Sequence, residues 1–167
     1  MPNLGGPREK VRRLYANVVS SIALYGAPIW SVALSKNRKA IAVLSKTQRR
    51  MAIRAVRGYR TISHAAATLM AGMPPIEMNA RAHARVYEQV AEQKARGIPV
   101  PKRGRRLLSL RIKEEVREEW RTWLADPRRA GQRTIQAILP HLDEWVERSW
   151  TRASYRTTQV LTGHGCF

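Results

Sequence analysis

Residues 37–58 read NRKAIAVLSKTQRRMAIRAVRG and predict one long amphipathic helix that ends at Gly58. At about 100° per residue, one side of this helix collects uncharged and mostly apolar residues. They are Ile41, Leu44, Gln48, Met51, Ala52 and Ala55. The opposite side collects cations within about 40°, with two more at its flanks. They are Lys39, Lys46, Arg50 and Arg57, flanked by Arg49 and Arg54, and only Ile53 interrupts them.

The basic side of this helix points to a phosphate backbone as its partner. A solvated helix face normally mixes charges of both signs, whereas residues 37–57 contain no acid. Phosphates repeat along nucleic acid, so a row of cations on a rigid helix can meet several of them at once. We therefore expect phosphate contacts from Lys39, Lys46, Arg49, Arg50, Arg54 and Arg57, and from Arg60 as a looser candidate. Two interpretations of Tyr59 stay open: stacking on a base, or packing beneath the turn.

Helical patterns continue on both sides of this stretch. Upstream, apolar residues recur every three or four positions over residues 8–24, and Gly26 and Pro28 should end that helix, leaving Trp30 in a short connection. Downstream, Ser63 caps a short helix over residues 63–70 that Gly72 stops, and Pro74 and Pro75 start one that reaches residue 96. On that last helix, His83 falls on the apolar stripe and is expected in the core.

The second half of the chain predicts further helices over residues 107–125, 134–150 and 152–161, with the middle one kinked at Pro140. The tryptophans of this half are expected to anchor the core. The fold class is all-α, with about six to seven helices: a basic helical bundle followed by a looser helical connector. Residues 97–106 form a basic Pro/Gly linker between a domain at 1–96 and a connector at 107–167.

The composition limits the partners. The 167 residues include 31 Lys/Arg against 12 Asp/Glu, a net charge of +19, and residues 1–60 hold 13 of those cations with one acid. Such an excess favours a polyanion, with an anionic membrane as the main competitor. No apolar run approaches the roughly 20 residues of a membrane span, so no membrane partner is expected. The single cysteine, Cys166, leaves no intrachain disulfide.

No complete catalytic or metal site emerges from the spacing of polar residues. The pairs Glu114–Glu115 and Glu118–Glu119 lie among cations and indicate a salt-bridged helix surface rather than magnesium ligands. The four histidines show no metal-binding spacing. The cluster at residues 102–106 has three open interpretations: a nuclear-import signal, a second phosphate patch, or a solubilising linker.

A helix-turn-helix DNA-binding domain is the alternative function. Residues 63–72 and the helix that follows have the required order, and the second helix would enter the major groove with its first residues. Those residues are Pro74, Pro75, Ile76, Glu77 and Met78. None of them suits a guanine or a phosphate, so this interpretation ranks second.

Three blocks resemble a known family. The patterns LYxxVVxSxxLYGAPxW (14–30) and QRxMAxRxxRGYRTxS (48–63) resemble the region that follows the polymerase domain in non-LTR retrotransposons. The block TQVLTGHGCF (158–167) is similar to the one that precedes their C-terminal zinc knuckle. The resemblance is nearest to arthropod type-1 elements that insert into ribosomal RNA genes, and it is weak over residues 97–130.

This resemblance implies a fragment of a polyprotein with endonuclease and reverse transcriptase (RNA-directed DNA polymerase) activities. Its first two helices would be the polymerase thumb, which grips an RNA/DNA template-primer duplex during target-primed reverse transcription. The implied partner is the polymerase domain, and the implied location is the nucleus after cytoplasmic synthesis. The magnesium-binding aspartates would lie upstream and the zinc ligands downstream, so no cofactor and no catalytic residue is expected here, and Cys166 is not counted as a zinc ligand.

A third hypothesis is structural: the helices mainly dock onto the polymerase domain. It predicts that the isolated chain aggregates or stays partly unfolded.

Overall fold

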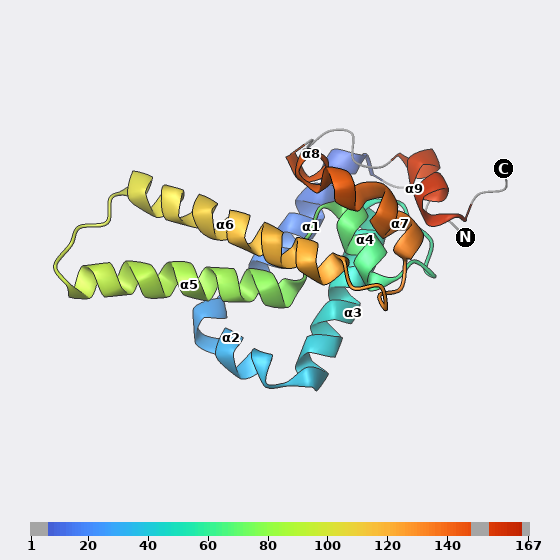
Figure 1. Cartoon of the computed structure of the whole chain (residues 1–167). Helices are drawn as coiled ribbons and strands as arrows, with labels where there is room; N and C mark the ends of the chain where they lie inside the picture. The colour runs from blue at the N-terminus through green and yellow to red at the C-terminus, as the bar shows by residue number, and fades with distance from the viewer. Residues whose placement is uncertain (1–6, 148–153, 165–167) are drawn as a thin grey trace.

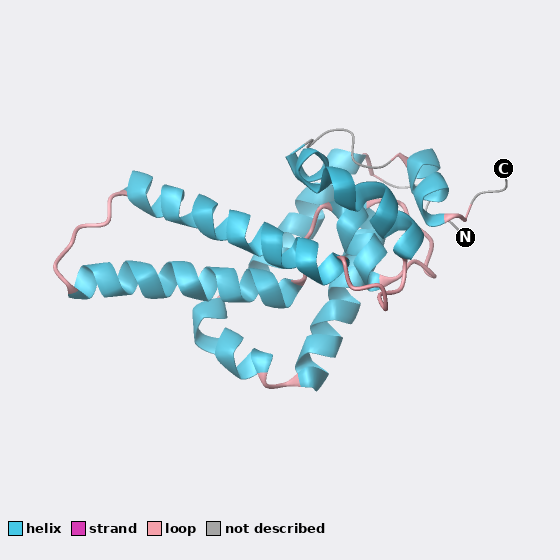
Figure 2. Ribbon diagram, in the orientation of Figure 1, coloured by secondary structure: helices cyan, strands magenta, loops and turns pink. Residues whose placement is uncertain are grey.

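The structure is a computed structural model that describes residues 7–147 and 154–164. These residues form helices and contain no strand, so the predicted all-α class is confirmed (Figure 2). The helices are α1 (Glu9–Ala23), α2 (Ala27–Ser35), α3 (Arg38–Ala55), α4 (His64–Ala71), α5 (Ile76–Ala95), α6 (Lys102–Leu124), α7 (Gln132–Ile138), the 3-10 turn η1 (Leu139–His141), α8 (Leu142–Glu147) and α9 (Tyr155–Thr162). They outnumber the expected six to seven because α2 was not predicted and the kinked helix counts as two.

The short helix α4 lies at the centre of the hydrophobic core (Figure 1). Its start and end were predicted: the Ser63 hydroxyl accepts a hydrogen bond from the Ala66 amide at 3.2 Å, and Gly72 closes the helix in the left-handed conformation. Every residue from Ala65 to Ala71 is buried. Alanines predominate on α4, and small side chains let α3 and α7 approach it closely on different sides.

Two long antiparallel helices, α5 and α6, form an arm that projects from this core (Figure 1). Near the core they are joined by the ion pairs Arg81–Glu119 and Arg85–Glu115. Helix α6 turns its apolar side inward: Ile112, Val116, Trp120 and Leu124 are buried, and Trp123 is partly buried.

The predicted linker is shorter than expected. Residues 102–106 are helical and belong to α6, so that only the segment around Gly97–Pro101 connects the two helices of the arm. Pro101 supplies the reason, because a proline immediately before a helix marks its start and cannot continue a preceding one. One apolar cluster includes both Ala52 and Leu142, so the two predicted domains share a core. Their separate roles as thumb and connector stay a prediction.

The connection expected around Trp30 is wrong. Gly26 adopts φ 69°, the chain turns, and Pro28 stands in the first turn of a new helix, α2, which packs on α5. Pro28 therefore starts a helix as well as following the end of one. The Trp30 indole donates a hydrogen bond to the Tyr25 carbonyl at 3.0 Å, across the turn.

Two residue placements also differ from expectation. His83 is exposed rather than in the core, although Ile76, Ala80 and Ala84 of the same stripe are buried. Met78 and Ala82 are buried as well, because α5 packs on both α2 and α6. Ile53 packs against the core rather than interrupting the basic face.

The C-terminal helices follow the predicted pattern where they are described. Pro140 lies in η1, between α7 and α8, which confirms the kink. Trp120 is fully buried and the Trp145 indole donates to the Leu69 carbonyl at 3.1 Å, so both anchor the core. Trp150, Arg152 and Cys166 lie outside the described residues.

Among the described residues, no single helix is long and apolar enough to cross a membrane. Lys10–Ala23 and Ala27–Ser35 pass that test only together, as a pair bent by 80°.

Candidate nucleic-acid interface

The basic face of α3 is an open row of cations. Lys39, Lys46, Arg50 and Arg54 are exposed, and no ion pair joins them to any residue that the structure describes. From Lys39 to Arg54 the row rises about 22 Å at ~1.5 Å per residue. That length equals the axial rise of about six base pairs at ~3.4 Å each. These four residues are called the α3 basic face below.

The opposite side of α3 is locked to the rest of the molecule through Gln48. Its side-chain amide donates to the Pro74 carbonyl at 2.7 Å. Its oxygen accepts from the Ile76 amide at 3.0 Å and from His64 Nε2 at 3.2 Å. Burial, and then the charges of Arg49 and Arg129, lower the pKa of His64, which favours the neutral ring in this network. The basic face thus stands on a helix with little freedom to rotate.

Arg49 differs from the other predicted contact residues because its side chain holds the following turn. Its Nε donates to the Ile62 carbonyl at 2.6 Å, and one terminal nitrogen donates to the Arg60 carbonyl. The guanidinium is half-buried there. The helical angle of Arg49, at the edge of the row, was the only sequence signal of this separate role.

Arg57 occupies a strained position at the end of α3. It adopts φ 55°, the left-handed region, and is the only non-glycine residue that does so among those described. The Gly58 amide donates to the Ile53 carbonyl at 2.8 Å, which is the closing bond of a Schellman motif. Glycine usually takes the left-handed place in that motif, but here Arg57 takes it, so α3 ends at Ala55, earlier than Gly58 predicts. The Arg57 Nε is buried without a hydrogen-bond partner.

Tyr59 packs beneath the turn, which decides between its two interpretations. Its ring stacks on His164 with centroids 5.0 Å apart, and its hydroxyl lies 3.1 Å from that of Tyr155. The Thr158 hydroxyl donates to the Val56 carbonyl at 2.8 Å, so α9 is fastened to the end of α3. Arg60 stays exposed beside it. The sequence gives no local signal that Thr158 and His164 pack on this turn.

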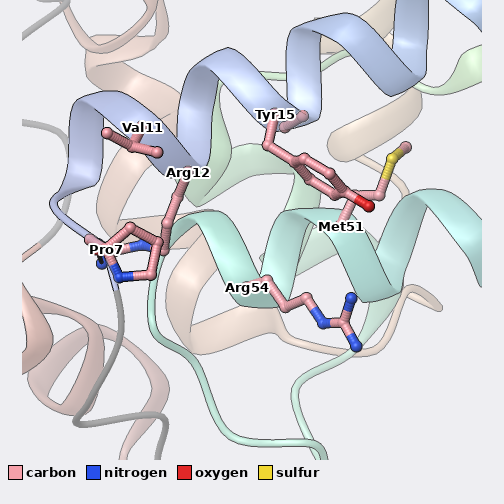
Figure 3. Close-up of a pocket in the computed structure, with 7 residues that line it drawn as sticks. Pro7, Val11, Arg12, Tyr15, Met51 and Arg54 are labelled. Carbon is pink, nitrogen blue, oxygen red and sulfur yellow. Dashed lines mark hydrogen bonds between the residues drawn. The ribbon is translucent and has the colours of Figure 1, made fainter.

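An apolar surface lies beside the basic face. The predicted apolar stripe of α1 is exposed, with Ile22 at 71%, whereas Ala16 on its other side is only 4% exposed. The exposed set is Val11, Leu14, Tyr15, Val18 and Ile22, continued by Tyr25, Ile29 and Val32. A pocket of about 230 Å³ lies between α1 and α3, where Tyr15 lies over Met51 beside Arg54 (Figure 3).

The first residues of α5 do not form a recognition helix. Pro75, Ile76 and Met78 are buried, and the Pro74 carbonyl is bonded to Gln48. A helix whose N-terminal residues lie in the core cannot enter a major groove with them. The structure therefore contradicts the helix-turn-helix alternative.

The paired glutamates of α6 form ion pairs, as predicted. Glu115 and Glu119 bond to α5, while Glu114 and Glu118 pair with Arg117 and Arg121 one turn away at 3.5 Å. In the described part of the chain, no group of three or more His, Cys, Asp or Glu side chains is placed to hold a metal ion.

The chain is similar to proteins of arthropod transposable elements. It is 27% identical over 164 residues to the "Retrovirus-related Pol polyprotein from type-1 retrotransposable element R1 4" of Nasonia vitripennis, covering 95% of the chain and 41% of that protein. It is 26% identical over 172 residues to the "Putative 115 kDa protein in type-1 retrotransposable element R1DM" of Drosophila melanogaster, covering 96% of the chain and 16% of that protein. No family model and no solved structure matches. The expected resemblance to arthropod type-1 elements is confirmed.

Proposed function

We propose that this chain acts within a retrotransposon polyprotein and holds the RNA/DNA template-primer duplex by its phosphates during target-primed reverse transcription. The observation that carries the proposal is the α3 basic face, an exposed, acid-free row on a helix whose other side is locked by Gln48. The similarity to type-1 element polyproteins supports it. The polymerase and endonuclease activities, with their magnesium and the zinc knuckle, belong in this proposal to other parts of the polyprotein.

Binding through this face should be nearly independent of nucleotide sequence. Phosphate contacts position a duplex without reading its bases. The face consists of lysines and arginines on the outside of a helix, and the nearby aromatic ring of Tyr59 is engaged by His164.

The polymerase domain is the proposed protein partner, at the exposed apolar stripe of α1. A stripe that repeats every three or four residues is typical of a helix face that packs against protein. The side of α1 with Ala16 already packs on α3, which leaves the stripe available to a partner. Action on chromosomal targets would place the polyprotein in the nucleus after cytoplasmic synthesis.

Removal of two charges from the α3 basic face tests the proposal. Lys46→Gln with Arg50→Gln keeps residues that favour helices, and Lys10→Gln with Arg156→Gln removes equal charge from exposed sites elsewhere. Affinity for a labelled RNA/DNA duplex is measured by fluorescence anisotropy over a range of salt concentrations. Affinity falls as salt rises, and the steepness of that fall (log affinity against log salt) should decrease by about two for the first pair, at ~0.9 per phosphate.

The control pair should leave that slope within a few tenths of the parent value. Equal slopes for the two pairs would show that only net charge matters, and the proposal would fail. Unlabelled duplexes of unrelated sequence should compete equally well, and a strong preference for one sequence would also contradict it.

A further inference from the structure

The outer half of the α5–α6 arm carries a second concentration of positive charge. Residues 88–113 hold eight Lys/Arg against two glutamates, Glu88 and Glu92. One of these glutamates is already paired, because Glu92 bonds to Arg96 at 2.6 Å. From Lys102 to Lys113, α6 contains no acid at all.

These cations share one side of α6. Lys102, Arg105, Arg106 and Lys113 fall within about 100° of each other around the helix axis, at ~100° per residue. All four are exposed, and together with Ser109 and Leu110 they line a shallow groove of about 460 Å³. We call these four residues the α6 basic face. It rises about 16 Å along the helix, close to the axial rise of five base pairs.

In the inner half of α6, residues 114–124, the charged side chains form ion pairs within the protein. There the acids of residues 114–119 pair with arginines of α5 or of α6 itself. Arg117 also reaches Asp143 at 3.3 Å and Arg121 reaches it at 2.8 Å, which joins α6 to α8. No ion pair joins the α6 basic face to any residue in the described part of the chain. These cations therefore make none of the ion pairs that join the inner half of α6 to α5 and α8.

The two basic faces belong to different layers of the molecule. Helix α2, which leads into α3, packs on α5, and α6 packs on α5 as well, so that α5 lies between α2 and α6 (Figure 1). The α6 basic face also lies on the projecting part of the arm, away from the core. The two basic faces therefore lie on separate parts of the molecule.

We propose that the α6 basic face is a second phosphate-binding site, which holds a separate stretch of nucleic-acid backbone. The unpaired charges, their common side and their length along a rigid helix match repeating phosphates. This site is separate from the α3 basic face, so that either proposal can be refuted without the other. An anionic membrane surface is the competing partner.

The test compares two triple variants of the full chain. Arg105→Gln, Arg106→Gln and Lys113→Gln remove three charges from the α6 basic face, and Arg8→Gln, Lys10→Gln and Arg156→Gln remove three from exposed sites away from the arm. The probe is a labelled duplex of about 30 base pairs, ~100 Å long, measured by anisotropy against salt. The α6 variant should lower the slope by about three, and the control variant by less than one.

Combination with Lys46→Gln and Arg50→Gln should add the two losses, since distant sites act independently. A parent-like slope for the α6 variant would overturn the second site, whatever the α3 pair does. If the α6 variant instead loses binding to phosphatidylserine vesicles while its duplex slope is unchanged, the site is a membrane surface and the inference is wrong.

Circular dichroism checks that the α6 variant keeps its helices. If the triple variant fails to fold, Arg105→Gln with Arg106→Gln alone tests the exposed outer end, with an expected slope change of about two. An unchanged slope in that pair overturns the proposal equally well.

Discussion

Helices α1 and α3 lie side by side and have the same kind of amphipathic sequence pattern, yet only α3 buries its apolar stripe. Each has an apolar stripe at helical spacing and cations elsewhere. Helix α3 buries Met51, Ala52 and Ala55 against the core, whereas α1 exposes its stripe and, among the residues whose burial is described, buries only Ala16. The comparison teaches that periodicity identifies an apolar face but does not say whether the partner of that face is in the same chain.

Side chains buried in the core should contribute far more to the stability of the isolated chain than those on the exposed stripe of α1. Trp120→Ala removes a fully buried indole and should lower the free energy of unfolding by about 3–5 kcal/mol. Ile22→Ala on the exposed stripe should change it by less than about 0.5 kcal/mol. Urea unfolding followed by circular dichroism measures both.

Trp120→Phe refines the same comparison. The Trp120 indole N–H is buried without a hydrogen-bond partner, so phenylalanine removes that unsatisfied donor and should cost less than alanine. A loss for Ile22→Ala as large as that for Trp120→Ala would mean that α1 is covered in the isolated chain, and the contrast between α1 and α3 would disappear.

Substitutions of Arg57, at the end of α3, should change stability and duplex binding in different ways. Arg57→Gly relieves the left-handed conformation and should stabilise the chain by about 0.5–1 kcal/mol. The same change should lower the salt slope of duplex binding by about one if Arg57 contacts a phosphate. Thermal unfolding and anisotropy are the two measurements.

Arg57→Gln is the matched control, because it removes the charge but keeps a side chain in the strained conformation. It should lower the slope without the gain in stability. Loss of stability in Arg57→Gly would show that the Arg57 side chain supports the fold, and an unchanged slope in both variants would remove it from the interface.

The smallest expected effect concerns the hydrogen bond between His64 and Gln48, on the side of α3 opposite the basic face. Burial, and then Arg49 and Arg129, hold the pKa of His64 below its usual value of 6.5. The unfolded chain therefore binds more protons near that pH, so the free energy of unfolding should fall as pH drops through 6.5 and level off below the folded pKa. Denaturant unfolding at several pH values measures this slope.

His64→Gln should flatten that dependence. His83, whose pKa is also lowered, by partial burial and Lys113, stays in both proteins and contributes with the same sign. The difference between the two curves therefore reports His64 alone. Identical curves would mean that protonation of His64 does not disturb its bond to Gln48.

Prediction from the sequence succeeded where the signal was local. Helix α3 begins at Arg38, next to the predicted start at Asn37, and Ser63 and Gly72 bound α4 as expected. The Asn37 side chain caps α3 by accepting a hydrogen bond from the Ala40 amide at 3.0 Å. Prediction failed for side chains whose contacts are made with residues distant in the sequence. Nothing near Arg49 in the sequence indicates that its side chain bonds to the carbonyl of Ile62, and nothing near Tyr59 indicates His164.

The sequence alone determined the all-α class, the caps and kinks, and the separation of cations from apolar residues on α3. These depend on spacing, on side-chain chemistry and on proline and glycine, and so act within a few residues. Only the tertiary structure decided that α2 forms against α5, that α6 extends to Lys102, and that the stripe of α1 stays exposed. The physical reason is that burial depends on which surfaces meet, and two helices with the same pattern can meet different numbers of neighbours.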